Sequence, residues 1–363
     1  MKIAIFGGSF DPIHKGHTKI ANWCINELEL DKLIFIPAFK SPFKTNRNLV
    51  DQNHRIEMIK LVLPEKCEIS DFELKRQGVS YTIETVKYFK NKYPNDELFL
   101  IIGSDNLPKL NKWKDIDELS KITKIAAFKR GKNINKLNLK RYNGILLNNP
   151  LFNYSSTEFK KGYLDVCDEK VIEYIGKNFL YAQELVTNML SAKRSKHSFA
   201  AATFAAEVAK GNKLNAKISY YAALFHDIAK EWDDEEHKNF LTRFGYDTAK
   251  YGRHEYHQLC GALWLEHIYK INNQEIIKSV RYHTTTNIYE QKVATELEKI
   301  VYIADKICEG RKFEGIQKLR EIALSDYKEA FKLVLKRTYD FEKSKGTIFS
   351  DVQEKTYKLN LEK

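Results

Sequence analysis

The sequence predicts an α/β domain built on a doubly wound parallel sheet, followed by an all-α domain. In the first half, short apolar runs alternate with longer segments of helical spacing, which is typical of parallel strands covered by helices. From about residue 171, apolar residues recur every three or four positions and strand patterns are few, which favours packed helices. The length of 363 residues exceeds the usual size of one hydrophobic core, so two domains are expected.

Apolar runs rich in β-branched residues are expected to form the buried strands of the first domain. They span residues 3–6, 33–37, 98–102, 125–128 and 144–147. The helices expected between them span residues 18–28, 53–63, 82–92 and 116–121. In such a sheet, ligands bind beyond the carboxyl ends of the strands, so residues 7–17 are expected to lie at a binding site.

The second half is expected to consist of helices only. They span residues 173–192, 198–209, 219–230, 259–271, 274–282, 296–307, 319–323 and 327–342. No linker rich in Gly, Ser or Pro separates the halves, so a helical junction within residues 180–193 is expected. We therefore assign residues 1–182 to the first domain and residues 183–363 to the second.

Composition argues for a globular protein of a reducing compartment. Hydrophobic residues make up 43% of the chain and charged residues 30%, a balance unlike that of disordered proteins. The apolar stretches are too short to cross a bilayer, and the N-terminus lacks the pattern of a signal peptide. The five cysteines are scattered, with no C-x-x-C pair, which favours free thiols over disulfides or a thiolate zinc site. We therefore expect a cytoplasmic protein with no membrane partner.

The formal net charge of +12 has three explanations. It is compatible with nucleic-acid binding, with attraction of polyphosphate substrates, and with a compositional bias toward Lys and Asn. The lysines are spread along the whole chain rather than gathered in one tract. This distribution argues against nucleic acid as the main partner.

Residues 7–17 read GGSFDPIHKGH and directly follow the first expected strand. A Gly-Gly turn lets backbone N–H groups approach a phosphate chain, and the N-terminus of the following helix adds positive potential. His14 and His17 supply donors that can hold a phosphoryl group while its bonding changes. The string contains neither the Walker pattern nor the Gly-x-Gly-x-x-Gly pattern. The turn residues expected to bind the nucleotide are Gly7, Gly8, Ser9 and Phe10.

Further polar residues fit the same site. Gly103 and Asp105 follow an expected strand, where a carboxylate can meet ribose hydroxyls or a metal. Lys44 and Arg130 are cationic candidates, although each taken singly also fits a solvated surface charge. A hydroxyl-rich segment can open a helix and meet phosphate, or serve as an ordinary helix cap. It consists of Ser155, Ser156 and Thr157.

This half of the sequence resembles the bacterial nicotinate-nucleotide adenylyltransferases, whose nucleotidylyltransferase domain is Rossmann-like. The resemblance covers residues 1 to about 182. It rests on GGSFDPIHKGH, the SPFK loop, NHRIEMI, SYTIETV, GSDNL, Trp113, KRG and SSTEFK. It implies that Tyr81, Thr82 and Trp113 enclose a nicotinate ring, although Trp113 alone would also fit plain packing. Family members usually have Arg at the position of Lys160. Lysine keeps the positive charge of arginine but lacks its bidentate fork.

The resemblance implies transfer of AMP from ATP to nicotinate mononucleotide, which gives deamido-NAD and pyrophosphate. The acceptor's 5′-phosphate is largely ionised near neutral pH and can attack the α-phosphorus directly, so the protein aligns the substrates and neutralises charge. His14 and His17 are expected to contact the triphosphate, with Lys44 and Lys160 assisting. Asp105 is expected on the adenosine side. Mg²⁺ is expected to balance the leaving pyrophosphate.

In the second half, the notable pair is His226-Asp227 within AALFHDIAK. Adjacent residues on a helix point about 100° apart. One side chain can therefore hold a single metal ion while the other reaches between two metal ions. Imidazole and carboxylate ligands without thiolates suit Fe, Mn, Co or Zn. Each of these histidines taken alone would be an ordinary core or surface residue. The other candidate ligands are His197, His257, His283 and Asp305.

The ordered set resembles the HD-domain phosphohydrolases over residues 185–345, and among them the branch that cleaves diadenosine tetraphosphate symmetrically. HDIAK, YHTTT and YIADKI carry the resemblance. The implied ligands are His197, His226, Asp227 and Asp305 for one metal ion, and Asp227, His257 and His283 for a second. Lys230 and Arg311 are the expected cations on the phosphate side. Iron is the expected metal, and it would promote the attack of water on a phosphoanhydride. The expected substrates are dinucleoside polyphosphates.

Three functions stay open from the sequence. The first, which we expect, is a bifunctional enzyme that adenylates nicotinate mononucleotide and hydrolyses dinucleoside polyphosphates to ADP. In the second, the HD half is a non-catalytic nucleotide sensor that regulates its neighbour. The third is an RNA-binding protein that contains nucleotide folds. A homo-oligomer is compatible with the sequence.

Overall fold

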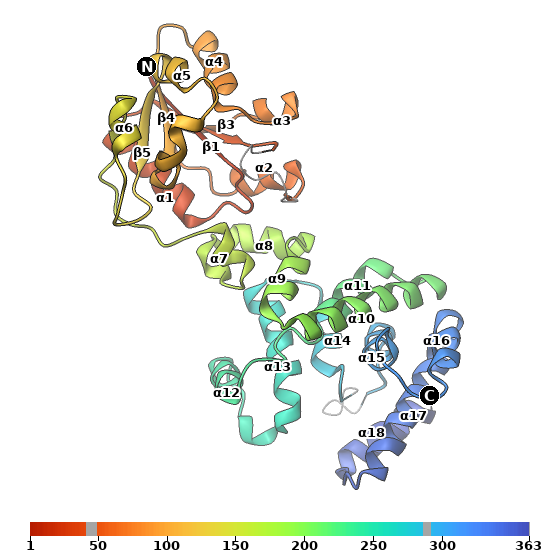
Figure 1. Cartoon of the computed structure of the whole chain (residues 1–363). Helices are drawn as coiled ribbons and strands as arrows, with labels where there is room; N and C mark the ends of the chain where they lie inside the picture. The colour runs from red at the N-terminus through yellow and green to blue at the C-terminus, as the bar shows by residue number, and fades with distance from the viewer. Residues whose placement is uncertain (41–48, 286–291, 363) are drawn as a thin grey trace. The chain divides into compact units, whose positions relative to one another are not determined.

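The computed structural model describes residues 1–40, 49–285 and 292–362. The chain divides into two compact units, Met1–Tyr174 and Ile175–Lys363, and Figure 1 shows a sheet in the first and helices in the second. This architecture confirms the predicted fold class. None of the described helices combines the length and apolar character that are needed to span a bilayer.

The first unit contains one parallel sheet of six strands in the order β3-β2-β1-β4-β5-β6. The strands are β1 (Lys2–Gly8), β2 (Lys32–Pro37), β3 (Cys67–Ile69), β4 (Glu97–Gly103), β5 (Lys124–Phe128) and β6 (Ile145–Leu146). The strand order reverses between β1 and β4, so the loops that follow these two strands diverge at their carboxyl ends. Such a reversal is where doubly wound folds bind nucleotides.

Helices connect the strands of the first unit (Figure 1). They are α1 (Lys15–Glu27), α2 (Gln52–Lys60), α3 (Phe72–Arg76), α4 (Thr82–Lys92), α5 (Ile116–Ile122), α6 (Leu137–Arg141) and α7 (Ser156–Lys160), with the 3₁₀ helices η1 (Ser104–Lys112) and η2 (Leu164–Val166). Apolar side chains of β1, β2, β4 and β5 form a continuous core with α4, η1 and α5. The rigid sheet therefore presents the loops after β1 and β4 from a fixed base.

The second unit is built from helices that pack in pairs. Its helices and the one that leads into it are α8 (Glu169–Asn178), α9 (Ala182–Met189), α10 (Ala192–Gly211), α11 (Ala216–Phe225), α12 (Asp234–Arg243), α13 (Tyr256–Leu263), α14 (Gln274–Tyr282), α15 (Glu296–Ile307), α16 (Ile316–Ser325), α17 (Tyr327–Ser344) and α18 (Asp351–Glu362). Short turns η3 (Thr248–Lys250), η4 (Arg253–Glu255) and the π-helical η5 (Trp264–Ile268) complete it. Helices α10, α11, α14 and α15 contact one another. Fully buried alanines such as Ala201, Ala205 and Ala222 let these helices approach closely.

Several element predictions were wrong at their boundaries. The helix expected over residues 173–192 is two helices, because Phe179 and Tyr181 adopt positive φ angles of 55° and 60°. The helix expected over residues 219–230 ends at Phe225, so the His226-Asp227 pair lies just beyond it. Strand β3 was not predicted, since three residues with one exposed Glu are too short for an apolar pattern.

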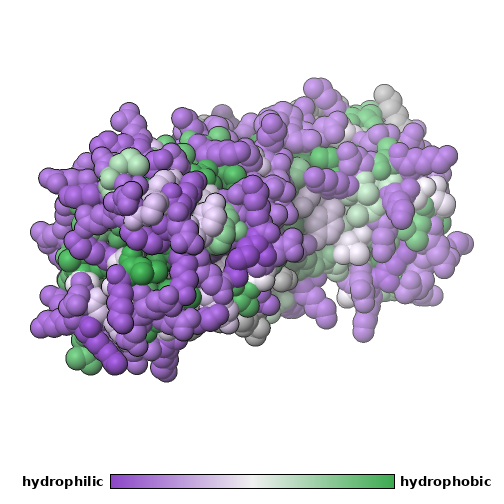
Figure 2. Space-filling view, turned by 90° about the horizontal axis from the view of Figure 1, so that it is seen from above, coloured by the Kyte–Doolittle hydropathy of each residue, from purple (hydrophilic) through white to green (hydrophobic). Residues whose placement is uncertain are grey.

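On the face that Figure 2 shows, hydrophilic side chains dominate and apolar ones form only small, separate patches. The long helices of the second unit therefore direct their apolar residues inward, as the spacing of three and four predicts.

Candidate active site and metal centre

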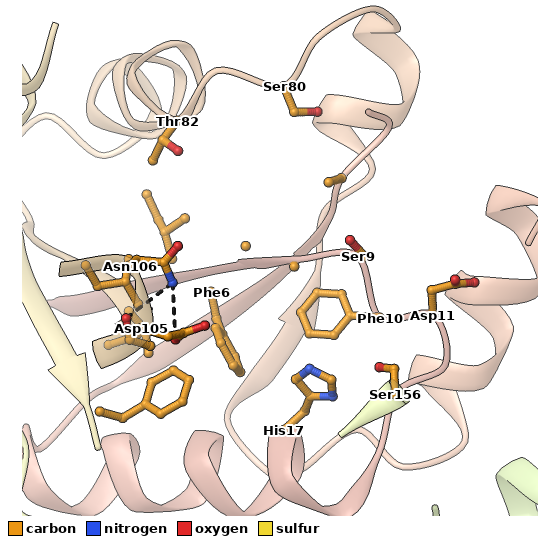
Figure 3. Close-up of a pocket in the computed structure, with 18 of the residues that line it drawn as sticks. Phe6, Ser9, Phe10, Asp11, His17, Ser80, Thr82, Asp105, Asn106 and Ser156 are labelled. Carbon is orange, nitrogen blue, oxygen red and sulfur yellow. Dashed lines mark hydrogen bonds between the residues drawn. The ribbon is translucent and has the colours of Figure 1, made fainter. Parts of the chain in front are cut away.

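A cavity of about 380 Å³ lies at the carboxyl ends of β1 and β4, where the strand order reverses. Figure 3 shows side chains from the loop after β1, from α1, from the start of α4 and from η1 facing this space. The predicted residues that line it are Gly7, Gly8, Ser9, Phe10, His14, His17, Thr82, Gly103, Asp105, Trp113, Arg130, Ser155, Ser156, Thr157 and Lys160. Residues from six separate parts of the chain thus converge on one pocket.

The two histidines of the signature string hold each other in place at the start of α1. The His14 Nδ1 atom accepts a hydrogen bond of 3.1 Å from the Gly16 N–H, and the His17 Nδ1 atom accepts one of 3.2 Å from the His14 N–H. Their rings stack with centroids 3.7 Å apart. Because Nδ1 accepts in both neutral rings, the proton resides on Nε2. Each ring therefore has an N–H donor on the edge away from its own backbone.

The electrostatic state of His14 follows from its position. Burial, together with the smaller effect of the nearby positive charge of Arg130, lowers the pKa of His14 to about 3. The ring is therefore neutral at physiological pH, and it acts as a hydrogen-bond donor rather than as a fixed cation.

Because the folded chain keeps the His14 imidazole neutral, we expect the protein to lose stability in acid. The pKa of His14 is about 3 in the folded chain and ordinarily 6.5, so between these values the unfolded chain binds a proton that the folded chain does not. The free energy of unfolding should fall as the pH drops below about 6.5, and His14→Asn should show less of this fall. Urea unfolding of both proteins at a series of pH values measures the difference. Identical pH slopes would contradict a neutral, buried His14.

The segments that follow β4 and β5 bring a carboxylate and a guanidinium to the same cavity. The Arg130 Nη1 atom lies 3.4 Å from the Asp105 Oδ2 atom. The Asn106 side-chain amide donates to the Gly103 carbonyl at 3.2 Å and contacts Asp105 Oδ1 at 3.5 Å (Figure 3). A Cβ atom at Gly103 would lie 2.2 Å from Asp105 Oδ1. Glycine is thus required there for Asp105 to fold back over the end of the strand.

A buried ion pair joins the signature loop to α7. The Lys160 Nζ atom lies 2.6 Å from the Asp11 Oδ2 atom, and only 7% of the Asp11 side chain is exposed. The other Asp11 oxygen accepts a hydrogen bond of 3.1 Å from the Val50 N–H. Ser155 caps α7 through the Glu158 N–H, and the Ser156 hydroxyl donates to the Pro12 carbonyl at 3.0 Å. Ser155 is thus an ordinary helix cap that also lines the cavity.

Of the predicted residues that the structure describes in this half, Tyr81 does not line the cavity. Lys44 lies outside the described residues. The Tyr81 ring packs against the core, and the Lys114 ammonium group lies 4.4 Å from its centroid. The cavity also contains residues that were not predicted, among them Asp11, Glu73, Ser80, Thr85 and Asn106. Asp11, Ser80, Thr85 and Asn106 lie within the quoted motifs GGSFDPIHKGH, SYTIETV and GSDNL, whereas Glu73 lies in none of them.

In the second unit, the four predicted histidines and two predicted aspartates form one cluster. The Asp305 Oδ1 atom lies 3.0 Å from His197 Nε2 and 3.7 Å from His226 Nε2. The Asp227 carboxylate lies 3.5 Å from His226 Nε2, 3.6 Å from His257 Nε2 and 3.5 Å from His283 Nε2. Two overlapping groups have a geometry that can hold a metal ion: His197, His226 and Asp305, and His226, Asp227 and His283.

Contacts at Nδ1 orient three of these imidazoles. His226 Nδ1 lies 2.6 Å from the Ala223 carbonyl, and His283 Nδ1 lies 2.7 Å from the Val280 carbonyl. His197 Nδ1 lies 3.5 Å from the Cys308 Sγ atom. A carbonyl accepts only from a protonated Nδ1, which leaves the Nε2 lone pair of His226 and His283 directed at the carboxylates. Metal-binding histidines are commonly held in this way.

The chemistry of the cluster fits a divalent metal. The Nε2 atom of His226 is buried and makes no hydrogen bond within the described structure, which is costly unless a ligand satisfies it. Burial acts to raise the pKa of Asp227, but the imidazoles of His226 and His283 lower it well below its usual range. Asp305 is likewise buried and has a lowered pKa. Carboxylates together with imidazoles are a donor set that transition metals prefer.

Cationic side chains border the cluster. The predicted Lys230 lies 3.0 Å from His257 Nε2, and the predicted Arg311 lies 2.9 Å from Asp305 Oδ1. Two further cations were not predicted: Arg194, 2.9 Å from Asp227 Oδ2, and Lys306, 2.8 Å from Asp305 Oδ2. These charges would attract an anionic substrate to the metal centre.

Comparisons with known proteins give matches for both halves of the chain. Residues 5–162 match the family described as "Cytidylyltransferase-like", and residues 194–310 match the "HD domain" family. A Mycoplasma genitalium protein named "Probable nicotinate-nucleotide adenylyltransferase/Ap4A hydrolase" is 32% identical over 349 residues, which cover 92% of this chain and 97% of the relative. A Mycoplasma pneumoniae protein of the same name is 30% identical over 350 residues, covering 94% and 100%.

A shorter relative matches the first half alone. A Clostridium tetani protein named "Probable nicotinate-nucleotide adenylyltransferase" is 40% identical over 197 residues, which cover 50% of this chain and 98% of the relative. The matches confirm the resemblance of each half to its family. The chain is therefore an enzyme that belongs to the nicotinate-nucleotide adenylyltransferases, in the form whose members carry a C-terminal HD domain.

Proposed function

We propose that this enzyme transfers AMP from ATP to nicotinate mononucleotide, forming deamido-NAD and pyrophosphate, and that its HD half hydrolyses dinucleoside polyphosphates to ADP. Residues 1–182 would form the adenylyltransferase domain and residues 183–363 the phosphohydrolase domain. The observation that carries the first activity is the pair of stacked imidazoles at the N-terminus of α1. Both rings line the cavity at the point where the strand order reverses. The second rests on the cluster of four histidines and two aspartates.

In the adenylyl transfer, the 5′-phosphate of the mononucleotide attacks the α-phosphorus of ATP, and the bond to the pyrophosphate oxygen breaks. The Nε2–H groups of His14 and His17 would donate to phosphoryl oxygens as negative charge moves onto the leaving group. Gly7 and Gly8 are the last residues of β1 rather than the expected turn. Their backbone N–H groups and the ammonium group of Lys160 would bind the phosphate chain, as would Lys44. ATP is expected to bind as its Mg²⁺ complex, which neutralises the pyrophosphate.

The two ends of the cavity suit the two other parts of the substrates. Asp105, beside Arg130, would accept hydrogen bonds from the ribose of the adenosine. Trp113 and the start of α4 at Thr82 line the same space and would enclose the pyridine ring, since a flat indole suits stacking.

In the HD half, we propose iron as the metal, with His197, His226, Asp227 and Asp305 as ligands of one ion. Asp227, His257 and His283 would hold a second. A bound divalent metal stabilises the charge that develops when water attacks a phosphoanhydride. Lys230 and Arg311 would bind the phosphate chain of the substrate and orient it, together with Arg194 and Lys306, which border the same cluster.

Product analysis of the purified full-length chain tests both activities. With ATP, Mg²⁺ and nicotinate mononucleotide, deamido-NAD and pyrophosphate should form. With Fe²⁺ or Mn²⁺ and diadenosine tetraphosphate, ADP should be the product. Nucleotide binding without release of ADP would contradict the hydrolase and support a sensor. Absence of deamido-NAD in the first reaction would contradict the transferase.

The ion pair of Asp11 with Lys160 gives a further prediction. Lys160→Met should raise the KM for ATP on the order of tenfold, because a hydrogen bond between charged groups contributes about 1.5–3 kcal/mol. Lys160→Arg should keep a low KM, since its guanidinium can reach both Asp11 and phosphate. Steady-state kinetics with varied ATP measures both. An unchanged KM in a folded Met variant would remove Lys160 from the triphosphate site.

A further inference from the structure

Glu73 on α3 is a buried carboxyl group that lines the adenylyltransferase cavity. Its Oε1 atom accepts a hydrogen bond of 2.7 Å from the Thr85 hydroxyl. Burial raises the pKa of Glu73, while its hydrogen bonds with the hydroxyls of Thr85 and Ser80 act in the opposite direction. Glu73, Ser80 and Thr85 are 6%, 8% and 2% exposed, so the three side chains form a connected polar group inside the protein.

This polar group connects α3, the start of α4 and the more distant chain segment that follows β2. The Ser80 hydroxyl oxygen accepts a hydrogen bond of 3.2 Å from the Phe39 N–H, and the Ser80 N–H donates to the Lys40 carbonyl at 2.9 Å. Thr85 belongs to the first turn and a half of α4. Glu73 therefore ties the chain after β2 to the start of α4 through two hydroxyl groups.

The tied segment forms one wall of the cavity. Ser80, Thr82 and Thr85 all line it. In Figure 3, Ser80 and Thr82 lie across the open space from His17 and Ser156. The wall is thus remote from the histidines that would hold the triphosphate. If ATP binds on their side, the mononucleotide must lie toward Ser80 and Thr82.

A purely structural role does not explain a carboxyl group at this position. Burying it costs free energy that an apolar side chain of similar size would not, and hydrogen bonds only offset that cost. The cost is understandable if the carboxyl group fixes the position of a wall that contacts a substrate. Small displacements of such a wall have large kinetic effects.

We propose that Glu73 is a positioning residue that sets the acceptor-binding wall of the cavity and so controls affinity for the mononucleotide but not for ATP. This inference rests on the proposed adenylyl transfer. It assigns no direct contact between Glu73 and either substrate. The residue acts through Ser80 and Thr85 on the segment that contains Thr82.

The test separates the two substrates kinetically. Glu73→Ala should raise the KM for nicotinate mononucleotide on the order of tenfold, with little change in the KM for ATP. Glu73→Gln, which keeps an oxygen acceptor of the same size, should restore most of the affinity. Thr85→Val removes the hydroxyl donor without changing volume and should shift the same KM in the same direction, which keeps the test decisive if Glu73→Ala does not fold.

Asp71→Ala is the matched control, because Asp71 belongs to the same short helix region and its side chain is 45% exposed. It should leave both KM values unchanged. A folded Glu73→Ala or Thr85→Val variant with unaltered mononucleotide KM would overturn the proposal, as would equal rises for both substrates. If the wild-type chain forms no deamido-NAD, the proposed function itself fails. Calorimetric binding of the mononucleotide to wild type and variants then decides whether Glu73 still shapes that wall.

Discussion

Replacing His17 with alanine is expected to reduce kcat for adenylyl transfer by about 10²–10³-fold, the usual effect of removing one preorganised donor to a developing anion. The Nε2–H donor of His17 is fixed in direction, since its Nδ1 atom accepts from the His14 N–H and its ring stacks on that of His14. Loss of the ring removes the donor and also frees the His14 ring. The measurement is kcat for deamido-NAD formation at saturating substrates.

The second site serves as the internal control for this variant. His17→Ala also removes a helix-capping contact, which costs about 1 kcal/mol of stability, so its folding must be checked. Unchanged hydrolysis of diadenosine tetraphosphate by the same preparation would show that the second unit is intact, and retained calorimetric binding of nicotinate mononucleotide would show that the first unit is folded. Adenylation near the wild-type rate would refute the role of His17.

Replacing Asp227 with asparagine is expected to abolish metal-dependent hydrolysis and to lower metal content. Its carboxylate is the one group of the cluster that lies close to His226, His257 and His283 together. The amide keeps the size but removes the charge that binds a divalent ion. Arg194, which pairs with Asp227 at 2.9 Å, would then repel the metal without compensation.

Metal analysis of the purified variant is the direct readout for Asp227→Asn, with ADP release as the second. Asp234→Asn is the matched control, because Asp234 has a partly exposed side chain on α12, where it pairs with Arg253. Adenylation should be normal in both variants. Full metal content in Asp227→Asn would show that the cluster does not depend on this carboxylate.

Local patterns predicted the features that depend on short stretches of chain. His14 and His17 are three residues apart, so a turn followed by a helix brings them together whatever surrounds them. The alternating strands and helices predicted a doubly wound sheet with a binding site beyond the carboxyl ends of its strands, which is where the cavity lies. The six metal-site candidates were recognised from their order along the chain and from the motifs around them. Their spacing in the sequence does not by itself indicate that they lie close together.

Features that depend on contacts distant in the sequence could not be predicted in this way. Asp11 and Lys160 are separated by 149 positions, and neither neighbourhood indicates the other. Arg194 and Lys306 look like surface charges in their helices, and only the fold places them at Asp227 and Asp305. Glu73 is a charged residue on a helix of five residues, which is too short for a sequence pattern to indicate a buried face. Only the packing shows that Glu73 is buried.

A crystal structure of the chain with a non-hydrolysable ATP analogue and nicotinate mononucleotide would test this mechanism directly. We expect phosphoryl oxygens within hydrogen-bond distance of the Nε2 atoms of His14 and His17, and the mononucleotide against the Ser80–Thr82 wall. A triphosphate bound away from both imidazoles would contradict it.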